Sequence, residues 1–271
     1  MNRQPIVAGQ FYPGDPAALY AEVERYLAQA DAPAHETRRS LLAMVPHAGY
    51  VFSGGVCGKT LGQARLPRTL VLLGPNHTGL GERLAVWPDG HWLLPGARLE
   101  VDGELAAALL EQGTGLRADT LAHVREHSLE VVLPFLHRLN PETRIVPIVV
   151  ADPSPDVLLR AGKALGRALA DWPEPVSLVV SSDMSHYVSD ARARELDGQA
   201  VDAALSLDPL KLYETVRARR ISMCGVLPMT LGLAAARELG ATEARLAAYA
   251  TSGEASRDFE QVVGYAGVLV D

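Results

Sequence analysis

The chain has 271 residues, of which 48% are hydrophobic, and since no change in composition divides it we expect one domain over residues 1–271. Its formal net charge is −7, and its acidic and basic residues are interspersed without the Lys/Arg cluster that a phosphate backbone requires, which argues against nucleic acid binding. The apolar runs are far shorter than the roughly 20 residues of a membrane helix, and the first five residues lead into no signal-peptide segment, so we expect a cytoplasmic protein.

The first predicted element is a helix over residues 15–29, which opens with an Asp-Pro pair and repeats its apolar residues at helical spacing. The polar stretch 31–39 then predicts a surface loop. Next come apolar runs of strand length that are rich in Val, Ile and Leu and do not alternate with polar residues, a pattern typical of strands buried on both faces. These runs are 41–45, 69–73, 144–150 and 176–180.

Helical patterns lie between or after these strands. They cover residues 103–111, 129–138, 156–170, 191–205, 209–218 and 226–238. The tail returns to strand character over 245–250 and 262–270. This alternation predicts an α/β fold with a central mixed, mostly parallel sheet flanked by helices.

Side chains that can bind a metal are found where predicted strands and helices meet loops. His47 and His77 each follow the end of a predicted strand in a loop rich in small residues, and Cys224 precedes the last predicted helix. Loops at the carboxyl ends of parallel strands converge on one crevice, which indicates a shared ligand. The dipole of the following helix favours a thiolate at Cys224, whereas Cys57 fits the alternative of a small buried residue, and we expect both cysteines as free thiols.

A second group of candidates could transfer protons. Asp183 and His186 follow the strand 176–180, and if a helical turn begins there, the carboxylate can orient the imidazole. The alternative is that Asp183 or its neighbour only caps a helix. Glu126 and Glu130 could have a purely structural role, because a carboxylate near the amino end of the helical pattern 129–138 is favoured by the helix dipole. That explanation does not apply to His127, which lies between them.

Several ordered motifs resemble the Memo family, called AmmeMemoRadiSam system protein B in bacteria and archaea. The motifs are AGQFYP at 8–13, PHAGY at 46–50, GPNH at 74–77, EHSLE at 126–130, SSDMSHY at 181–187 and CG at 224–225. The resemblance implies a fold similar to that of class III nonhaem iron extradiol dioxygenases, with helices on both faces of the sheet. It also implies a metal site of His47, His77 and Cys224, with Asp183 and His186 in the same cleft. The thiolate departs from the two histidines and one carboxylate of those dioxygenases, which argues against ring cleavage of catechols.

The favoured functional hypothesis is an iron- or copper-dependent redox enzyme of unknown substrate, although zinc also fits the ligand set. In it His186, oriented by Asp183, handles protons, and Glu126 and His127 complete the pocket. One alternative is a non-catalytic module that binds a peptide or partner protein in the same cleft. Another is a metal-dependent hydrolase. The resemblance further implies a pathway shared with an AMMECR-type protein and a radical SAM enzyme.

Overall fold

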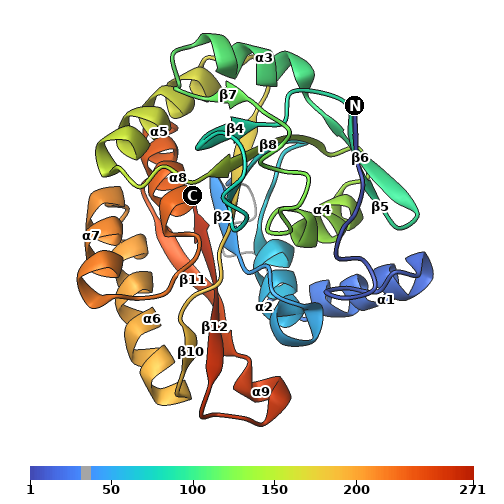
Figure 1. Cartoon of the computed structure of the whole chain (residues 1–271), viewed down its shortest axis with the longest axis vertical. Helices are drawn as coiled ribbons and strands as arrows, with labels where there is room; N and C mark the ends of the chain where they lie inside the picture. The colour runs from blue at the N-terminus through green and yellow to red at the C-terminus, as the bar shows by residue number, and fades with distance from the viewer. Residues whose placement is uncertain (32–37) are drawn as a thin grey trace.

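The computed structural model describes residues 1–31 and 38–271. The loop predicted over 31–39 falls mostly between these two ranges and so lies outside the described residues. The described strands form one 12-stranded sheet with helices on both sides of it (Figure 1). The prediction of an α/β fold with a mixed, mostly parallel sheet is confirmed.

Five neighbouring parallel strands form the centre of the sheet. In spatial order they are β6 (Ala97–Val101), β8 (Arg144–Val150), β3 (Thr69–Pro75), β9 (Val176–Ser181) and β2 (Leu42–Val45). Beyond β2 the sheet continues antiparallel through β12 (Val262–Val270), which also pairs with β11 (Ala244–Thr251) and β10 (His186–Val188). Beyond β6 it continues through β5 (His91–Leu94) and β1 (Asn2–Arg3), and β4 (Leu84–Val86) joins β8 to β7 (Arg117–Ala118).

The helices cover the two faces of the sheet as separate groups (Figure 1). One group comprises α1 (Pro16–Leu27), α2 (Tyr50–Gln63) and α4 (Leu133–Leu139), the last preceded by a 3-10 turn, Glu130–Val132. The other comprises α3 (Gly103–Glu111), α5 (Pro155–Ala170), α6 (Asp190–Leu205), α7 (Pro209–Arg219) and α8 (Val226–Glu238). A short helix, α9 (Gly253–Ser256), lies between β11 and β12. Among the described residues, no helix combines the length and apolar character needed to cross a membrane.

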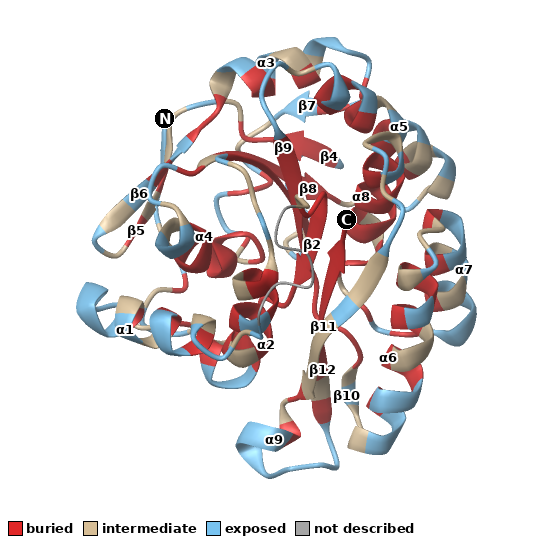
Figure 2. Ribbon diagram, turned by 180° about the vertical axis from the view of Figure 1, so that it is seen from behind, coloured by how far each residue is buried: buried red, intermediate tan, exposed pale blue. Residues whose placement is uncertain are grey.

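Strand β2 illustrates why the central strands are largely apolar. Leu42 and Met44 belong to the core beneath α5 and α8, whereas Ala43 and Val45 belong to the core beneath α1 and α2. Successive side chains of a strand point to opposite faces, so a strand covered on both faces needs apolar residues throughout. Figure 2 shows β2, β8 and β9 as a buried layer between the two groups of helices.

Helix α2 was not predicted, because glycines interrupt its sequence. These glycines let α1 approach closely: a Cβ atom on Gly54 would lie 2.4 Å from the ring of Tyr26, and one on Gly58 would lie 2.5 Å from the Tyr26 backbone. The close approach requires residues without side chains, which lowers the intrinsic helix propensity that sequence reasoning depends on.

The helical turn considered at Asp183 is not formed. Residues 182–185 adopt no regular structure, and His186 begins strand β10. The main chain here is bonded to β12 instead, because Met184 N donates to Gly264 O at 2.8 Å and Gly264 N donates to Ser185 O at 2.8 Å. Hydrogen bonds to a distant strand therefore override the local capping pattern.

Candidate metal centre

The candidate metal centre lies beyond the carboxyl ends of β2 and β3. It brings together His47, which follows β2, His77, which follows β3, and Cys224, which precedes α8. Their ligand atoms all lie within 4.8 Å of one another. Nε2 of His47 is 3.4 Å from Sγ of Cys224, and the two imidazole rings cross at 75° with their centroids 5.3 Å apart. In a tetrahedral site with ordinary metal–nitrogen and metal–sulfur bonds, nitrogen and sulfur ligands lie roughly 3.5 Å apart. The spacing therefore fits a single transition-metal ion.

The Nε2 atom of His47 is free to bind such an ion because its Nδ1 proton is already used. Nδ1 contacts the hydroxyl of Ser181, and that hydroxyl donates its only proton to the carbonyl of Ser128 at 2.6 Å. Ser181 can therefore only accept from His47, which fixes the proton on Nδ1 and the lone pair on Nε2. Burial, with the nearby His77 and His127, holds the pKa of His47 well below its ordinary value, so the ring is neutral.

Glu126 fixes His77 in the same way. Its carboxylate accepts from the His77 ring at Nδ1 (2.9 Å), from the His77 backbone N–H (2.5 Å) and from the Ser128 backbone N–H (2.9 Å). Burial opposes ionisation of Glu126, but these hydrogen bonds and the charge of His77 outweigh it and lower the carboxyl pKa to about 2. Burial would likewise lower the pKa of His77, but the bond to Glu126 raises it. A carboxylate that holds Nδ1–H leaves Nε2 as the ligand, as is usual for metal-binding histidines.

Cys224 is held as a thiol by its surroundings. Burial, followed by the negative charge of Asp183, raises its pKa. The prediction that α8 favours the thiolate is wrong, because the amide of Gly225 at the start of α8 donates to Ser182 Oγ (3.1 Å), and the amide that reaches Sγ belongs to Asp183 (3.2 Å). A bound cation reverses this situation, since a coordinating thiol loses its proton.

Asp183 and His186 have different partners from those predicted. The buried carboxylate of Asp183 accepts from the backbone N–H of His47 at 2.8 Å, and burial raises its pKa although this bond opposes the rise. His186 bonds to Ser222, through Nδ1 to the carbonyl (2.9 Å) and through its backbone N–H to the hydroxyl (2.7 Å). The prediction that Asp183 orients His186 is therefore wrong: Ser222 holds the ring and leaves Nε2 available.

His127 lies against both histidine ligands. Its ring stacks on His77 with a centroid distance of 5.0 Å and meets the edge of His47 at 5.6 Å. Burial is the main cause of its lowered pKa, which the charge of Glu126 opposes. His127 is thus a neutral imidazole beside both histidines, where it can accept a proton.

Comparison with known proteins identifies the family. Over residues 3–269 the chain matches the family described as Memo-like protein. The chain belongs to the Memo-like family. A MEMO1 family protein of Methanopyrus kandleri is 38% identical over 283 aligned residues, which cover 99% of each chain. MEMO1 family proteins of Methanosarcina barkeri and Aquifex aeolicus are each 39% identical, over 99% and 98% of this chain and 100% and 98% of their own.

Among solved structures, this Memo-like chain is similar in fold to an uncharacterized protein of Escherichia coli K12, JW3007. The two share 15% sequence identity with a TM-score of 0.51, over 84% of this chain and 99% of the other. At this identity the likeness shows the fold alone.

Two residues that support the Memo-like centre were not singled out in the sequence. Ser181 is a polar residue at the end of the apolar strand β9, and Ser128 follows Glu126 and His127 directly. Ser128 binds both residues that hold the histidine rings. Its carbonyl accepts from Ser181, which holds His47, and its amide donates to Glu126, which holds His77. The signals that could have identified them are the position of Ser181 at the end of a buried strand and that of Ser128 next to the candidate His127.

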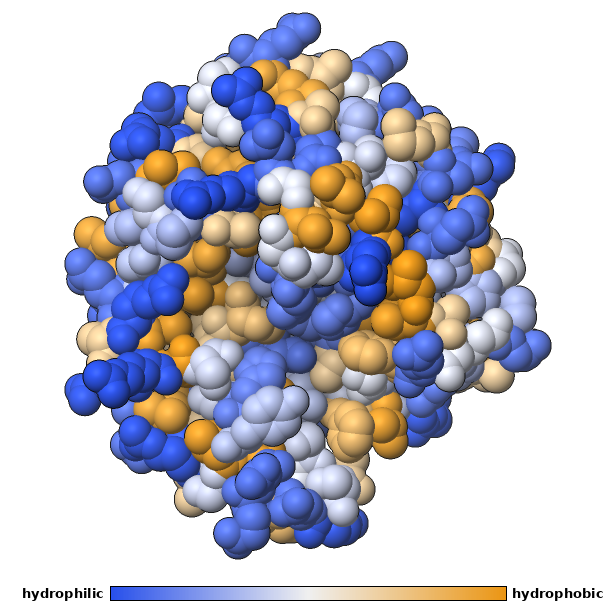
Figure 3. Space-filling view, in the orientation of Figure 1, coloured by the Kyte–Doolittle hydropathy of each residue, from blue (hydrophilic) through white to orange (hydrophobic). Residues whose placement is uncertain are grey.

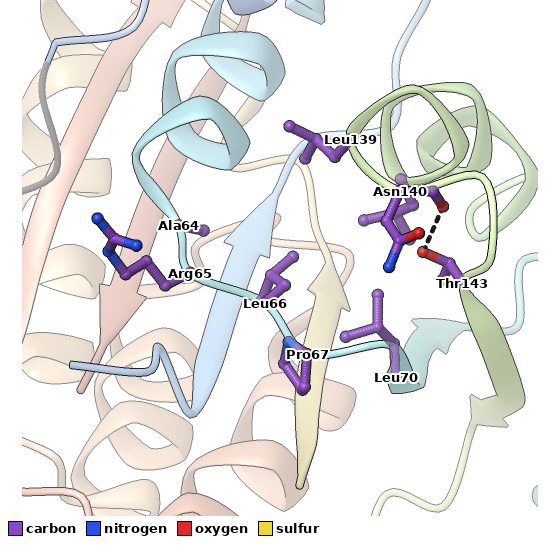
Figure 4. A pocket seen from close by; sticks show the side chains of 9 residues that line it. Ala64, Arg65, Leu66, Pro67, Leu70, Leu139, Asn140 and Thr143 are labelled. Atoms are coloured by element: carbon purple, nitrogen blue, oxygen red, sulfur yellow. Dashed lines mark hydrogen bonds between the residues drawn. The ribbon is translucent and has the colours of Figure 1, made fainter. Parts of the chain in front are cut away.

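A separate cavity of about 260 Å³ lies at the other end of β3 (Figure 4). Leu66 and Pro67, which line it, precede β3, whereas His77 follows the strand, and seven strand residues span roughly 20 Å. Its other lining side chains include Leu139, and Thr143 donates to the carbonyl of Asn140 at 2.8 Å. This cavity is therefore no part of the metal centre.

On the molecular face seen in Figure 3, hydrophobic and hydrophilic side chains are interspersed.

Proposed function

We propose that this protein is a metal-dependent redox enzyme in which His47, His77 and Cys224 bind an iron or copper ion. The observation that supports the proposal is the convergence of three ligand atoms within 4.8 Å, with both imidazole Nδ1 atoms already bonded elsewhere. Imidazole and thiolate ligands suit iron, copper or zinc rather than magnesium or calcium. Three protein ligands leave further coordination positions for a substrate, as in catalytic sites. The resemblance to extradiol dioxygenases favours a redox-active metal.

The surrounding residues suit proton transfer at such a centre. The metal, when bound, supplies a Lewis acid and a redox couple. His127 is neutral and lies against both histidine ligands, so it can accept a proton from a bound substrate. His186, held by Ser222, presents Nε2 as a second proton acceptor. Asp183 fixes the main chain of His47 and adds negative charge beside Cys224.

Metal analysis of protein purified without oxygen tests this proposal. We expect near-stoichiometric iron or copper in the native protein and loss of the ion from Cys224→Ser, because that variant lacks the thiolate. Cys57→Ala is the matched control, since Cys57 is the other free cysteine and is buried in α2. It should retain the ion. Full metal retention by Cys224→Ser would remove Cys224 from the ligand set, and zinc alone in the native protein would favour the hydrolase.

One observation favours the second candidate, a module that binds a peptide. An open groove of about 410 Å³ is lined by residues 9–13, Glu22 and residues 49–52. Val51 and Phe52 are exposed in it, and the ring centroids of Phe11 and His127 lie 5.0 Å apart. Dioxygen consumption or product formation with candidate substrates supports the enzyme. Tight peptide binding that survives metal removal, without turnover, supports the module.

A further inference from the structure

The buried side chain of Arg3 holds the segment that carries Glu126 and His127. Nε of Arg3 donates to the carbonyl of His123 at 3.1 Å, and Nη2 donates to the carbonyl of Glu126 at 2.5 Å. Nη1 forms an ion pair with Glu130 at 2.7 Å, with both side chains inaccessible to solvent, and the guanidinium lies 4.3 Å from the ring centroid of Trp92. One cation therefore binds three points of the segment 123–130.

The two carbonyl groups that Arg3 contacts enclose the turn leading to Glu126. The amide of Glu126 donates to the same His123 carbonyl, at 3.2 Å, so Arg3 binds one end of this turn and the Glu126 carbonyl at the other. The Glu126 carboxylate then receives both N–H groups of His77. The contacts thus run without a break from Arg3 through Glu126 to a metal ligand.

Glu130, the ion-pair partner of Arg3, also binds the N-terminal residues that follow Arg3. Its carboxylate accepts from the amides of Ile6 and Val7 at 2.9 to 3.0 Å and from the hydroxyl of Tyr12 at 2.7 Å. A buried ion pair is weak evidence for stability, because apolar residues of similar volume often do as well. The planar fork of arginine, however, can hold several acceptors in one fixed geometry, which an ammonium group cannot do.

We propose that Arg3 is a positioning residue of the metal centre: it fixes the main chain of Glu126, and through the Glu126 carboxylate it sets the orientation and Nδ1 proton of His77. The inference rests on the proposed metal site for its effect on affinity. Its effect on His77 exists without any metal.

The experiment compares Arg3→Met and Arg3→Lys with the native protein and with Leu165→Ala. Leu165 is buried in α5, in the core on the other face of the sheet, so its truncation lowers stability without touching the segment 123–130. The first readout, in metal-free protein, is the NMR signal of the His77 Nδ1 proton. The second is the affinity for cobalt(II), with the thiolate-to-metal absorption band as the spectroscopic signature.

We expect the His77 Nδ1 proton signal to be lost or broadened in Arg3→Met and cobalt(II) to bind roughly tenfold more weakly, at the lower end of the range for outer-shell partners. Arg3→Lys should regain part of the stability, because it keeps a charge beside Glu130, but little of the affinity. Leu165→Ala should keep both the native proton signal and the native affinity. If Arg3→Met does not fold, Tyr12→Phe tests the inference in its place, because it removes one hydrogen bond from Glu130. Its effects on the proton signal and on the cobalt(II) affinity should be smaller than those expected for Arg3→Met but in the same direction.

A native proton signal and native affinity in folded Arg3→Met, or in Tyr12→Phe if Arg3→Met does not fold, would overturn the inference while leaving the metal site intact. Failure of the native protein to bind cobalt(II) would count against the proposed function instead. In that case the His77 proton signal alone decides whether Arg3 has the positioning role.

Discussion

The hydroxyl of Ser181 offers a direct test of whether the protein prepares His47 for the proposed metal. The Ser181→Ala substitution removes the acceptor of the His47 Nδ1 proton and the donor to the Ser128 carbonyl. Ser177→Ala is the matched control, because Ser177 is a fully buried serine of the same strand and its hydroxyl donates to the carbonyl of Ser40 at 2.7 Å. The two substitutions remove the same group from one strand, but only one of these groups contacts the metal centre.

The expected magnitudes follow from the groups left unpaired. Ser181→Ala leaves a buried N–H and a buried carbonyl without partners, at about 1–3 kcal/mol each, whereas Ser177→Ala leaves one carbonyl. We therefore expect a loss in the free energy of unfolding of roughly 2–6 kcal/mol for Ser181→Ala and roughly 1–3 kcal/mol for the control. Without its acceptor, the His47 proton can move to Nε2, 3.4 Å from Cys224 Sγ, where it blocks the ligand atom. A preference of about 1.4 kcal/mol for that tautomer would leave roughly one-tenth of the molecules with a free Nε2 and so lower metal affinity about tenfold.

The assay is a competition titration against a chromophoric chelator in oxygen-free buffer, accompanied by urea unfolding of each metal-free variant. The reasoning predicts weaker metal binding in Ser181→Ala and native binding in Ser177→Ala. Equal affinity of the two folded variants would refute it, since the Ser181 hydroxyl would then have no part in selecting the tautomer of His47.

Two further predictions concern buried ionisable groups. Glu126→Gln places an amide against three N–H donors, so metal affinity should fall roughly 10- to 100-fold in the same titration; an unchanged affinity would show that Glu126 does not support His77. For His123, burial lowers the pKa from 6.5 to about 4, so the unfolded chain binds the proton more tightly than the folded one. This residue's contribution to stability is complete above pH 6.5, is lost as the pH falls toward 4, and amounts to about 3 kcal/mol. Urea unfolding between pH 4 and 7 should show a smaller pH dependence in His123→Gln, and equal slopes would contradict the assignment.

The sequence allowed the central strands and most helices to be predicted because burial on two faces leaves a local pattern. Helix α8 was predicted with its observed bounds, and β3 and β9 extend only slightly beyond their predicted runs. The convergence of His47 and His77 followed from the rule that parallel strands end at a common edge. These predictions use information carried by consecutive residues.

The contacts around the centre could not be predicted in this way. Arg3 is an isolated basic residue in the sequence, and its partner Glu130 is separated from it by 127 positions. Asp183 and His186 are three residues apart, which suggested a direct interaction, but hydrogen bonds to β12 turn the intervening chain and give each a different partner. Long-range hydrogen bonds leave no periodic trace in a single sequence.

The separation of the three candidate ligands also determines when the proposed metal centre could form during synthesis. His47 and Cys224 are 177 residues apart. At roughly 5–20 residues per second, a ribosome needs on the order of 10 to 35 seconds to pass from one to the other. During this interval the nascent chain carries two imidazoles without the cysteine that completes the set. An ion bound by all three residues would therefore load only after the chain has been extended past Cys224.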